Sequence, residues 1–439
     1  MRKVIYVLLI VIFTFIGCVE KDKTIVVDDN VLMEEIRNSK KITMEELNIP
    51  LEDGYTFQPG FIYEDKIYGV ILRLSDNWTE EDMYNAYYSK DEGLVKVNKI
   101  SGYEEYIGMS YKNKVCIGWG GKKDDNYYMV DNTTGDRMKL PEINITKREE
   151  IKEATPVKDE NGNINIDFLT NEDNQSGMSS GYYKIIEENN NYGYRVITTG
   201  SSDSDRNDSN NSGWYYDKID YNSYDNVQSL MVLFDLENKK SIIYGGELNA
   251  LEFPVIADVF YSKKNNKFYA IGGYLQDEIY EINIKDDTYN LNLYYKFDYD
   301  DRLTRVWNSK ILDNSIILET YIPSEIDKEG SFNAKEIEHV LFNLDSKEIN
   351  VFEKDKNNIS YFISNLNSDK YLIINRSDYN SMEGKGYLCR VRNNVVEYMY
   401  EIESGSSFYM IMDEDEKIMI NYYRNEYESK YEIYKLDIE

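Results

Sequence analysis

One pattern recurs six times along the chain: a short polar turn followed at once by an apolar run. Its copies are "EDKIYGVIL", "KNKVCIGW", "NNKFYAIGG", "DNSIILETY", "SDKYLIIN" and "DEKIMINYY". Anchored on Lys66, Lys114, Lys267, Ser315, Lys370 and Lys417, the copies are separated by steps of 48, 153, 48, 55 and 47 residues. Two more apolar runs joined by a polar turn follow each copy, as in "VLFDLENKKSIIYGG". Such runs, divided by Asn, Asp, Lys and Gly, predict strands and turns, and the 42 tyrosines also favour strand.

A unit of about 48 residues with about four strands resembles a blade of a β-propeller. A small antiparallel sheet cannot bury both of its faces alone, whereas a ring of such sheets buries them between neighbours. We therefore predict an all-β fold, a β-propeller over residues 55–439, in preference to a pair of sandwiches or a β-solenoid. The resemblance rests on period and pattern, because no WD, kelch or Asp-box signature is present. In a general way it is similar to the TolB-type and peptidase-associated propellers.

The long step of 153 residues contains an insertion around 143–228 and sets the blade count. Within it, 181–200 has the pattern of a strand pair that begins a blade, and "LMVLFDLENKKSIIYGG" completes that blade. This interpretation gives seven blades. If "GNINIDFL" at 162–169 begins a blade of its own, the count is eight. We predict seven.

The sequence ends just after an inner strand pair of the last repeat, at Glu439. The last blade then lacks its outermost strand, and an N-terminal strand would close the ring and cover an exposed edge. Two segments are candidates for this strand: "KTIVVDD" at 23–29, and the residues from Tyr55 to Phe61.

The N-terminus has the pattern of an export signal. Met1-Arg2-Lys3 precede an uninterrupted apolar run from Val4 to Val19, which is a little short for a membrane-spanning helix. Phe15-Ile16-Gly17-Cys18 resembles the lipobox of bacterial lipoproteins, in which the cysteine sulfur receives a diacylglyceryl group and signal peptidase cuts before it. The family usually has Leu where Phe15 stands. The resemblance implies a signal peptide at 1–17, lipidation of Cys18, and a lipid-anchored protein on the extracytoplasmic face of the cell membrane. The alternative is an uncleaved anchor.

Residues 18–54 are expected to form the lipid attachment and a tether. "TMEELNIP" contains a capping box from Thr43 to Glu46 and a stop at Pro50, which predicts one or two short helices.

Charge and composition exclude several functions. With 50 Lys and Arg against 80 Asp and Glu, the net charge of −30 repels nucleic acid, so no nucleic-acid partner is expected.

Two cysteines remain besides Cys18. They are Cys116 and Cys389, which lie in apolar strand patterns and are predicted to be buried apolar residues rather than a disulfide.

The usual catalytic residue sets are scarce. His339 is the only histidine, in "EIEHVLFNL", and we interpret it as a strand residue near a sheet edge. A multi-histidine zinc site is therefore excluded, and no nucleotide-binding glycine loop is present. Paired carboxylates could serve a glycosidase, but 80 acidic residues do not single out a pair. The runs at 298–302 and 412–417 are interpreted as solvated turns. No catalytic residue, metal or cofactor is predicted.

The polar stretch at 201–226 is the weak candidate for a ligand site. Trp214, Tyr215 and Tyr216 could form an aromatic platform for a sugar or a peptide. Asp203-x-Asp205-x-Asn207 has the spacing of a calcium loop, but Asp208 stands where an EF-hand needs Gly and Trp214 where it needs Glu. A loop without a ligand is the simplest interpretation.

We expect, then, a membrane-anchored lipoprotein whose non-catalytic propeller binds a protein or glycan partner at the cell envelope. The alternatives are an envelope glycan hydrolase that uses paired carboxylates, and a cation-dependent adhesion or sensor module.

Overall fold

A computed structural model describes most of the repeat region and two short N-terminal segments. The described residues are 23–26, 42–46, 49–52, 54–74, 80–100, 104–111, 114–119, 127–139, 145–148, 166–169, 178–180, 184–186, 189, 191–199, 228–246, 254, 256–272, 278–297, 303–323, 334–352, 360–364, 368, 370–377, 384–402, 408–412, 418–424 and 429–436. Within these ranges the chain is built from strands. The prediction of an all-β fold is confirmed.

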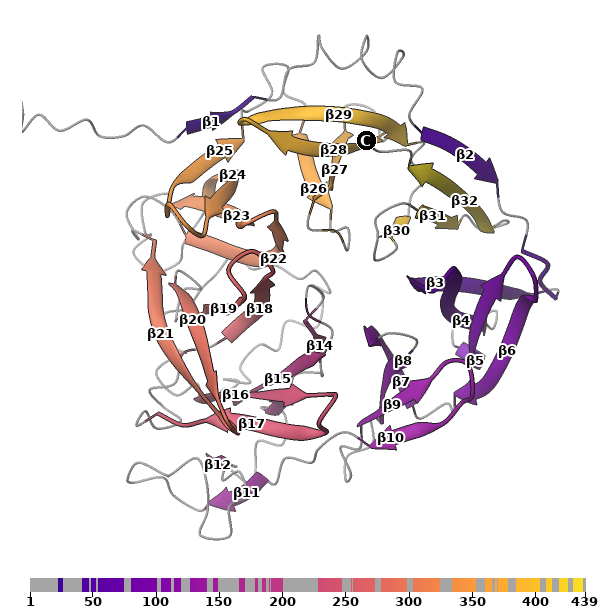
Figure 1. The fold of residues 1–439 in the computed structure, drawn as a ribbon, viewed down its shortest axis with the longest axis horizontal. Helices are drawn as coiled ribbons and strands as arrows, with labels where there is room; N and C mark the ends of the chain where they lie inside the picture. Colours follow the sequence, from indigo (N-terminus) through magenta and orange to yellow (C-terminus); the bar gives the residue numbers. More distant parts are fainter. Residues whose placement is uncertain are drawn as a thin grey trace, which may run out of the picture.

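Seven blades of mostly antiparallel strands surround a common centre (Figure 1). Blade 1 contains β3 (Tyr55–Tyr63), β4 (Lys66–Leu74), β5 (Glu80–Ser89) and β6 (Gly93–Ile100). Blade 2 contains β7 (Glu104–Tyr111), β8 (Lys114–Trp119), β9 (Tyr127–Asp131) and β10 (Arg137–Lys139). Blade 3 contains β13 (Met178–Ser180), β14 (Lys184–Ile185), β15 (Tyr192–Thr199), β16 (Gln228–Asp235) and β17 (Lys240–Tyr244). Blade 4 contains β18 (Ile256–Ser262), β19 (Lys267–Gly272), β20 (Glu278–Lys285) and β21 (Thr288–Lys296).

The remaining three blades complete the circle. Blade 5 contains β22 (Leu303–Leu312), β23 (Ser315–Pro323), β24 (Ala334–Asn343) and β25 (Ile349–Phe352). Blade 6 contains β26 (Ser360–Ser364), β27 (Leu372–Ser377), β28 (Gly384–Arg392) and β29 (Val395–Ile402). Blade 7 contains β30 (Phe408–Met412), β31 (Ile418–Arg424) and β32 (Ser429–Leu436). The first strand of each blade lies nearest the centre, and the later strands follow outward (Figure 1).

The count of seven, made over the described residues, confirms the predicted number. Segment 162–169 does not begin a blade, because its strand β12 (Ile166–Leu169) pairs with β11 (Ile145–Arg148) in a separate two-stranded sheet. Segment 181–200 supplies β14 and β15, and these pair with each other at the start of blade 3, as predicted.

Strands in the middle of a blade are apolar on both faces because a neighbouring blade covers each face. In β4, Ile67 and Ile71 pack into a cluster that includes Ile433 of blade 7. The alternate residues Tyr68, Val70 and Leu72 pack into another cluster, which includes Val130 of blade 2. Successive side chains of a strand point to opposite faces. An uninterrupted apolar run such as "IYGVIL" therefore results from burial between two blades rather than against one core.

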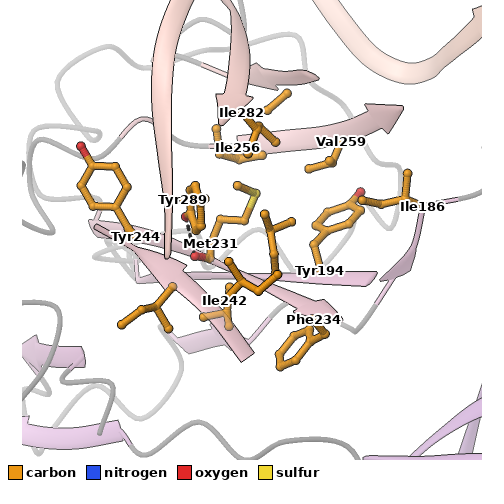
Figure 2. Close-up of a cluster of buried hydrophobic side chains, with 14 of the residues drawn as sticks. Ile186, Tyr194, Met231, Phe234, Ile242, Tyr244, Ile256, Val259, Ile282 and Tyr289 are labelled. Carbon is orange, nitrogen blue, oxygen red and sulfur yellow. Dashed lines mark hydrogen bonds between the residues drawn. The ribbon is translucent and has the colours of Figure 1, made fainter. Parts of the chain in front are cut away.

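Blades 3 and 4 share the largest described core cluster (Figure 2). Met231 and Ile242 come from blade 3, and Ile256, Ile282 and Tyr289 come from blade 4. The Tyr289 hydroxyl is fully buried and donates a hydrogen bond to the Met231 carbonyl at 2.6 Å. The outermost strands of these two blades also pair in parallel, with Tyr244 opposite Tyr289. A continuous sheet therefore joins blades 3 and 4 at the rim.

Two N-terminal strands lie on the outer edge of the ring. β1 (Lys23–Ile25) pairs in parallel with β25 of blade 5, and the next residue, Val26, bridges to Val395 of blade 6. β2 (Ile42–Glu46) pairs antiparallel with β32 and supplies the missing fourth strand of blade 7.

The prediction that an N-terminal strand completes the last blade is confirmed, but both candidate segments were wrong. Residues 23–25 are in blade 5, and Tyr55–Phe61 belong to the innermost strand of blade 1. The strand that closes the ring contains the capping box at Thr43 and Glu46, for which we predicted a helix. The backbone groups of β32 would otherwise lie at an open edge, and pairing them outweighs a local helix signal.

The ring has two faces with different connections. In each blade the turn from first to second strand, and in blades 1 to 6 also the turn from third to fourth strand, lies at one end of the strands, which we call the turn face. The links from second to third strand, and from one blade to the next, lie at the other end, which we call the connection face. The turns are short, as between Tyr63 and Lys66, while the links include the long segments 140–177 and 200–227.

Candidate functional site

Hydrogen-bonding side chains fix the turns of the turn face. Asp131 accepts hydrogen bonds from the backbone N–H groups of Thr133 and Thr134, and Asn343 accepts them from Asp345 and Ser346. The residue that ends such a turn has a positive φ, as at Gly135 and Lys347. Asx side chains stabilise turns in this way because they replace the missing backbone partner.

Polar contacts also connect neighbouring blades across the turn face. The buried Ser262 hydroxyl of blade 4 donates a hydrogen bond to Asn314 of blade 5 at 2.6 Å. Lys264 forms an ion pair with Asp345 at 3.1 Å between the same two blades, and Lys240 of blade 3 contacts Asp287 of blade 4 at 2.6 Å. These side chains have partners within the ring, and we therefore assign a structural role to the turn face.

A cluster of cations and tyrosines lies toward the connection face of blade 1. We define the blade 1 cluster as Tyr55, Arg73, Asp82, Tyr84, Lys96 and Lys99. These residues come from β3, β4, β5 and β6. Tyr55 opens β3, Arg73 lies near the end of β4 and Lys99 near the end of β6, so the antiparallel register brings them together. The Tyr55 and Tyr84 rings also pack against the core between blades 1 and 7.

The cations of the cluster lie close to the aromatic rings. Lys96 Nζ is 4.4 Å from the centre of the Tyr55 ring and 5.2 Å from that of Tyr84. Lys99 Nζ is 5.8 Å from the Tyr84 ring, and the Arg73 guanidinium carbon is 5.9 Å from the Tyr55 ring. Contacts of this length are favourable cation–π interactions. The rings thus hold three positive groups on the surface of a chain whose net charge is −30.

Two carboxylates, Asp82 and Glu52, balance part of this charge. Asp82 accepts a hydrogen bond from Lys99 and a longer one, at 3.4 Å, from the Tyr55 hydroxyl. The Lys99 hydrogen bond lowers the pKa of Asp82 and raises the pKa of Lys99. Both groups are therefore charged at neutral pH. Lys96 also lies 3.3 Å from Glu52, whose side chain is 72% exposed.

The arrangement suits an anionic ligand that has a flat or amphipathic surface. Tyrosine rings stack on sugar or peptide groups, and the lysines and Arg73 can hold a carboxylate. A purely structural role is the competing interpretation, because blade 4 has a comparable cross-strand pair. There Lys296 contacts Glu278 at 2.6 Å, and Tyr280 donates to the same carboxylate. Blade 1 differs because three cations surround two rings.

The sequence-predicted site residues lie largely outside the described residues. This holds for Cys18, for Trp214, Tyr215 and Tyr216, and for the candidate calcium loop at 203–208. The described strands β15 and β16 flank segment 200–227, so that segment leaves and rejoins the ring at the connection face. The ligand-binding role of the three aromatic residues stays a prediction. The acidic runs 298–302 and 413–417 are also outside the described residues.

The histidine and the cysteines have structural positions. His339 is buried in β24, which lies between β23 and β25, so a strand is confirmed and a position near a sheet edge was wrong. Cys389 is buried in β28 of blade 6, while Cys116 lies in β8 of blade 2. These blades are not neighbours in the ring (Figure 1), which argues against a disulfide between the two cysteines.

Sequence reasoning missed the blade 1 cluster because its members are spread over 45 residues. The available signal was the pair of lysines in "LVKVNKI", but Lys96 and Lys99 are three residues apart and share a face only because the pairing of β5 with β6 is irregular between them. The partners on β3, β4 and β5 follow only from the register. Within the described part of the chain, we find no group of three or more His, Cys, Asp or Glu that could hold a metal ion. Nor do the described residues contain a helix long and apolar enough to cross a membrane.

Comparison with known proteins shows the fold alone. No family model and no curated protein matches the chain. Among solved structures, an oligogalacturonate lyase in complex with manganese has a TM-score of 0.51 and 9% identity, over 90% of this chain and 96% of the other. The oligogalacturonate lyase from Vibrio parahaemolyticus has a TM-score of 0.51 and 8% identity, over 90% and 97%. The β-propeller domain of the Trilobed protease from Pyrococcus furiosus has a TM-score of 0.44 and 10% identity, over 89% and 97%.

Proposed function

We propose that the protein is an extracytoplasmic lipoprotein whose non-catalytic propeller binds a protein or glycan partner at the cell envelope. The observation that supports the anchor is Cys18, placed where an apolar run of a signal peptide ends. The mature chain would then start five residues before Lys23, the first described residue of the ring. A lipid with two acyl chains at this position holds a protein stably at a membrane.

The partner is proposed to bind on the connection face. The turn face is occupied by contacts within the ring, whereas the connection face has the longer links and the blade 1 cluster. Loops and exposed side chains on a rigid scaffold are where binding residues are usually found. The positive groups of the cluster favour a partner with carboxylates, either an acidic glycan or an acidic protein segment.

Photo-crosslinking in intact cells tests this assignment. We would place a crosslinking amino acid at Arg73 or Lys99 on the connection face, and at Lys240 or Lys264 on the turn face. The proposal predicts capture of the same partner from both connection-face positions and from neither turn-face position. Capture from the turn face alone would contradict it.

A binding assay with purified protein tests the glycan branch. A Lys96→Gln/Lys99→Gln variant is expected to bind acidic oligosaccharides at least tenfold more weakly, a loss of about 1.4 kcal/mol. Lys240→Gln/Lys264→Gln, which removes the same charge from the turn face, is the matched control. The envelope glycan hydrolase remains the alternative function. Release of shortened products from acidic oligosaccharides by the native protein, without added enzyme, would support that alternative and overturn the non-catalytic role.

A further inference from the structure

The short N-terminal segment that we call the rim segment, residues 23–26, fixes where the chain joins the ring. Lys23, Thr24 and Ile25 pair with Asn350, Val351 and Phe352 of β25. Ile25 is fully buried between blades 5 and 6. The Val26 N–H donates to the Asn394 carbonyl at 2.9 Å, and the Val396 N–H donates to the Val26 carbonyl at 2.9 Å. Contacts to two blades prevent this segment from sliding.

The direction of β1 decides the face from which the chain leaves the ring. β25 follows the turn at 343–348, so β25 starts at the turn face and runs toward the connection face. β1 is parallel to β25, with Lys23 opposite Asn350 near its start. Lys23 therefore lies toward the turn face, on the outer edge of blade 5, and the backbone enters β1 from that side.

The chain between Cys18 and Lys23 is too short for a lipid on Cys18 to reach the connection face. Five peptide steps reach at most about 18 Å when fully extended. Part of that reach is used inside the polar headgroup layer, which is roughly 5 to 8 Å thick on each side of the bilayer. A strand of eight residues spans about 26 Å between the two faces of the ring. A lipid on Cys18 can therefore bring the turn face near the bilayer but not the connection face.

The surface at this position is compatible with lipid headgroups. Val26 and Val395, which bridge to each other, are 38% and 40% exposed, and they are two of the three large apolar residues that are exposed among the described ones. Arg392, on the turn before Val395, has a side chain that is 57% exposed, and its Nε lies 3.9 Å from the Glu397 carboxylate. Exposed apolar side chains beside a cation are a combination that membrane surfaces accommodate.

From these observations we infer that the turn face at blades 5 and 6 rests against the membrane surface, and that the connection face points away from it. The inference rests on the proposed lipidation of Cys18. It replaces the long tether expected for residues 18–54 by a short one, because residues 23–26 and 42–46 are strands of the ring. It also deepens the proposed function: the partner approaches from the side opposite the lipid.

Quenching by brominated lipids tests the orientation. The lipidated protein would be reconstituted in vesicles of phosphatidylglycerol and dibrominated phosphatidylcholine, with a fluorescent amino acid at Arg392 or, for comparison, at Lys296 near the connection face. Bromine quenches only at contact range. We therefore expect strong quenching at 392 and little at 296, since about 26 Å separates the two faces. Equal quenching at both positions, or stronger quenching at 296, would overturn the inference.

A longer tether supplies the matched control. Inserting roughly 20 Gly and Ser residues between Asp22 and Lys23 adds about 25 Å of root-mean-square reach. The inserted variant is expected to remain lipidated while the quenching at 392 falls toward the value at 296. Quenching at 392 that survives the insertion would show that the short tether does not set the orientation, and would overturn the inference.

Incorporation of a labelled fatty acid is measured first, with Cys18→Ser as the unlabelled reference. Absence of label in the native protein refutes the anchor itself, and with it this inference. A labelled protein without a difference between positions 392 and 296 refutes the orientation alone.

Discussion

A single buried hydrogen bond shows how the ring is held together at the level of residues. Ser262 is fully buried, and its hydroxyl donates to Asn314 and accepts from the Asn265 N–H. Ser262→Ala would leave Asn314 without this donor in a buried contact between blades 4 and 5. We expect the free energy of unfolding to fall by about 1–3 kcal/mol. Chemical denaturation measures it, with the exposed Asn290→Ala as control. A loss no larger than that of the control would show that the contact contributes nothing.

Another residue-scale prediction concerns acid stability. The hydrogen bond from Lys264 is the main reason why the pKa of Asp345 is lowered in the folded protein. A lowered pKa stabilises the fold at pH values above the ordinary value of 3.8, and this contribution is lost as the pH falls through the lowered pKa. Asp345→Asn should therefore slightly reduce the thermal midpoint at pH 6.

The difference between Asp345→Asn and the native protein should shrink as the pH falls below 3.8 and disappear once the pH lies below the lowered pKa of the folded protein, where the native carboxyl is protonated. Asp91→Asn, in an exposed turn of blade 1, controls for the general effect of removing one charge from an acidic chain. A difference that grows on acidification would contradict the sign of the effect.

At the scale of elements, β2 is the strand on which ring closure depends. Met44→Pro would remove a backbone N–H from the middle of β2 and fix its φ, so pairing with β32 would be disrupted. We expect amide hydrogen exchange in β32 to become at least tenfold faster, which corresponds to about 1.4 kcal/mol. Met44→Ala separates the loss of the side chain from the loss of pairing. Unchanged exchange in β32 would mean that β2 does not stabilise blade 7.

The joined outer strands of blades 3 and 4 depend on a glycine. A Cβ on Gly245 would lie 2.9 Å from the Cβ of Thr288, which is closer than packed carbons allow. Gly245→Ala should therefore cost about 1–3 kcal/mol of unfolding free energy. In the double variant with Thr288→Gly the combined loss should be smaller than the sum of the two single losses, since the clash is removed. Strict additivity would show that the two residues do not touch.

The strands were predictable where the sequence repeats, and the connections between distant segments were not. Runs such as "KIYGVIL" are apolar because two blades cover them, and that property is local to the sequence. The sequence did not reveal that residues 42–46 form the closing strand, because the capping box at Thr43 and Glu46 favours a helix. Only pairing with the edge of β32 in the folded ring makes a strand more favourable. The blade 1 cluster could not be predicted from the sequence for a related reason. Arg73 and Lys99 are 26 residues apart, and only the register of β4, β5 and β6 brings them to one face.

At the scale of the whole molecule, charge dominates the behaviour in solution. A net charge of −30 on 439 residues destabilises the compact state by self-repulsion. Raising the sodium chloride concentration from about 10 mM to about 150 mM shortens the Debye length from about 30 Å to about 8 Å. The thermal midpoint should therefore rise. A midpoint that falls over this range would mean that the ion pairs between blades, such as Lys240 with Asp287, outweigh the repulsion.

We propose one order along the ring axis: a lipid at Cys18, the turn face near the bilayer, and the connection face with its positive cluster directed outward. Each later step depends on the anchor. The most direct measurement is therefore the mass of the N-terminal peptide of the protein isolated from its native membrane. We expect a peptide that starts at Cys18 and has the added mass of a diacylglyceryl group. A peptide that starts at Met1, or one that contains an unmodified Cys18, would contradict the central claim.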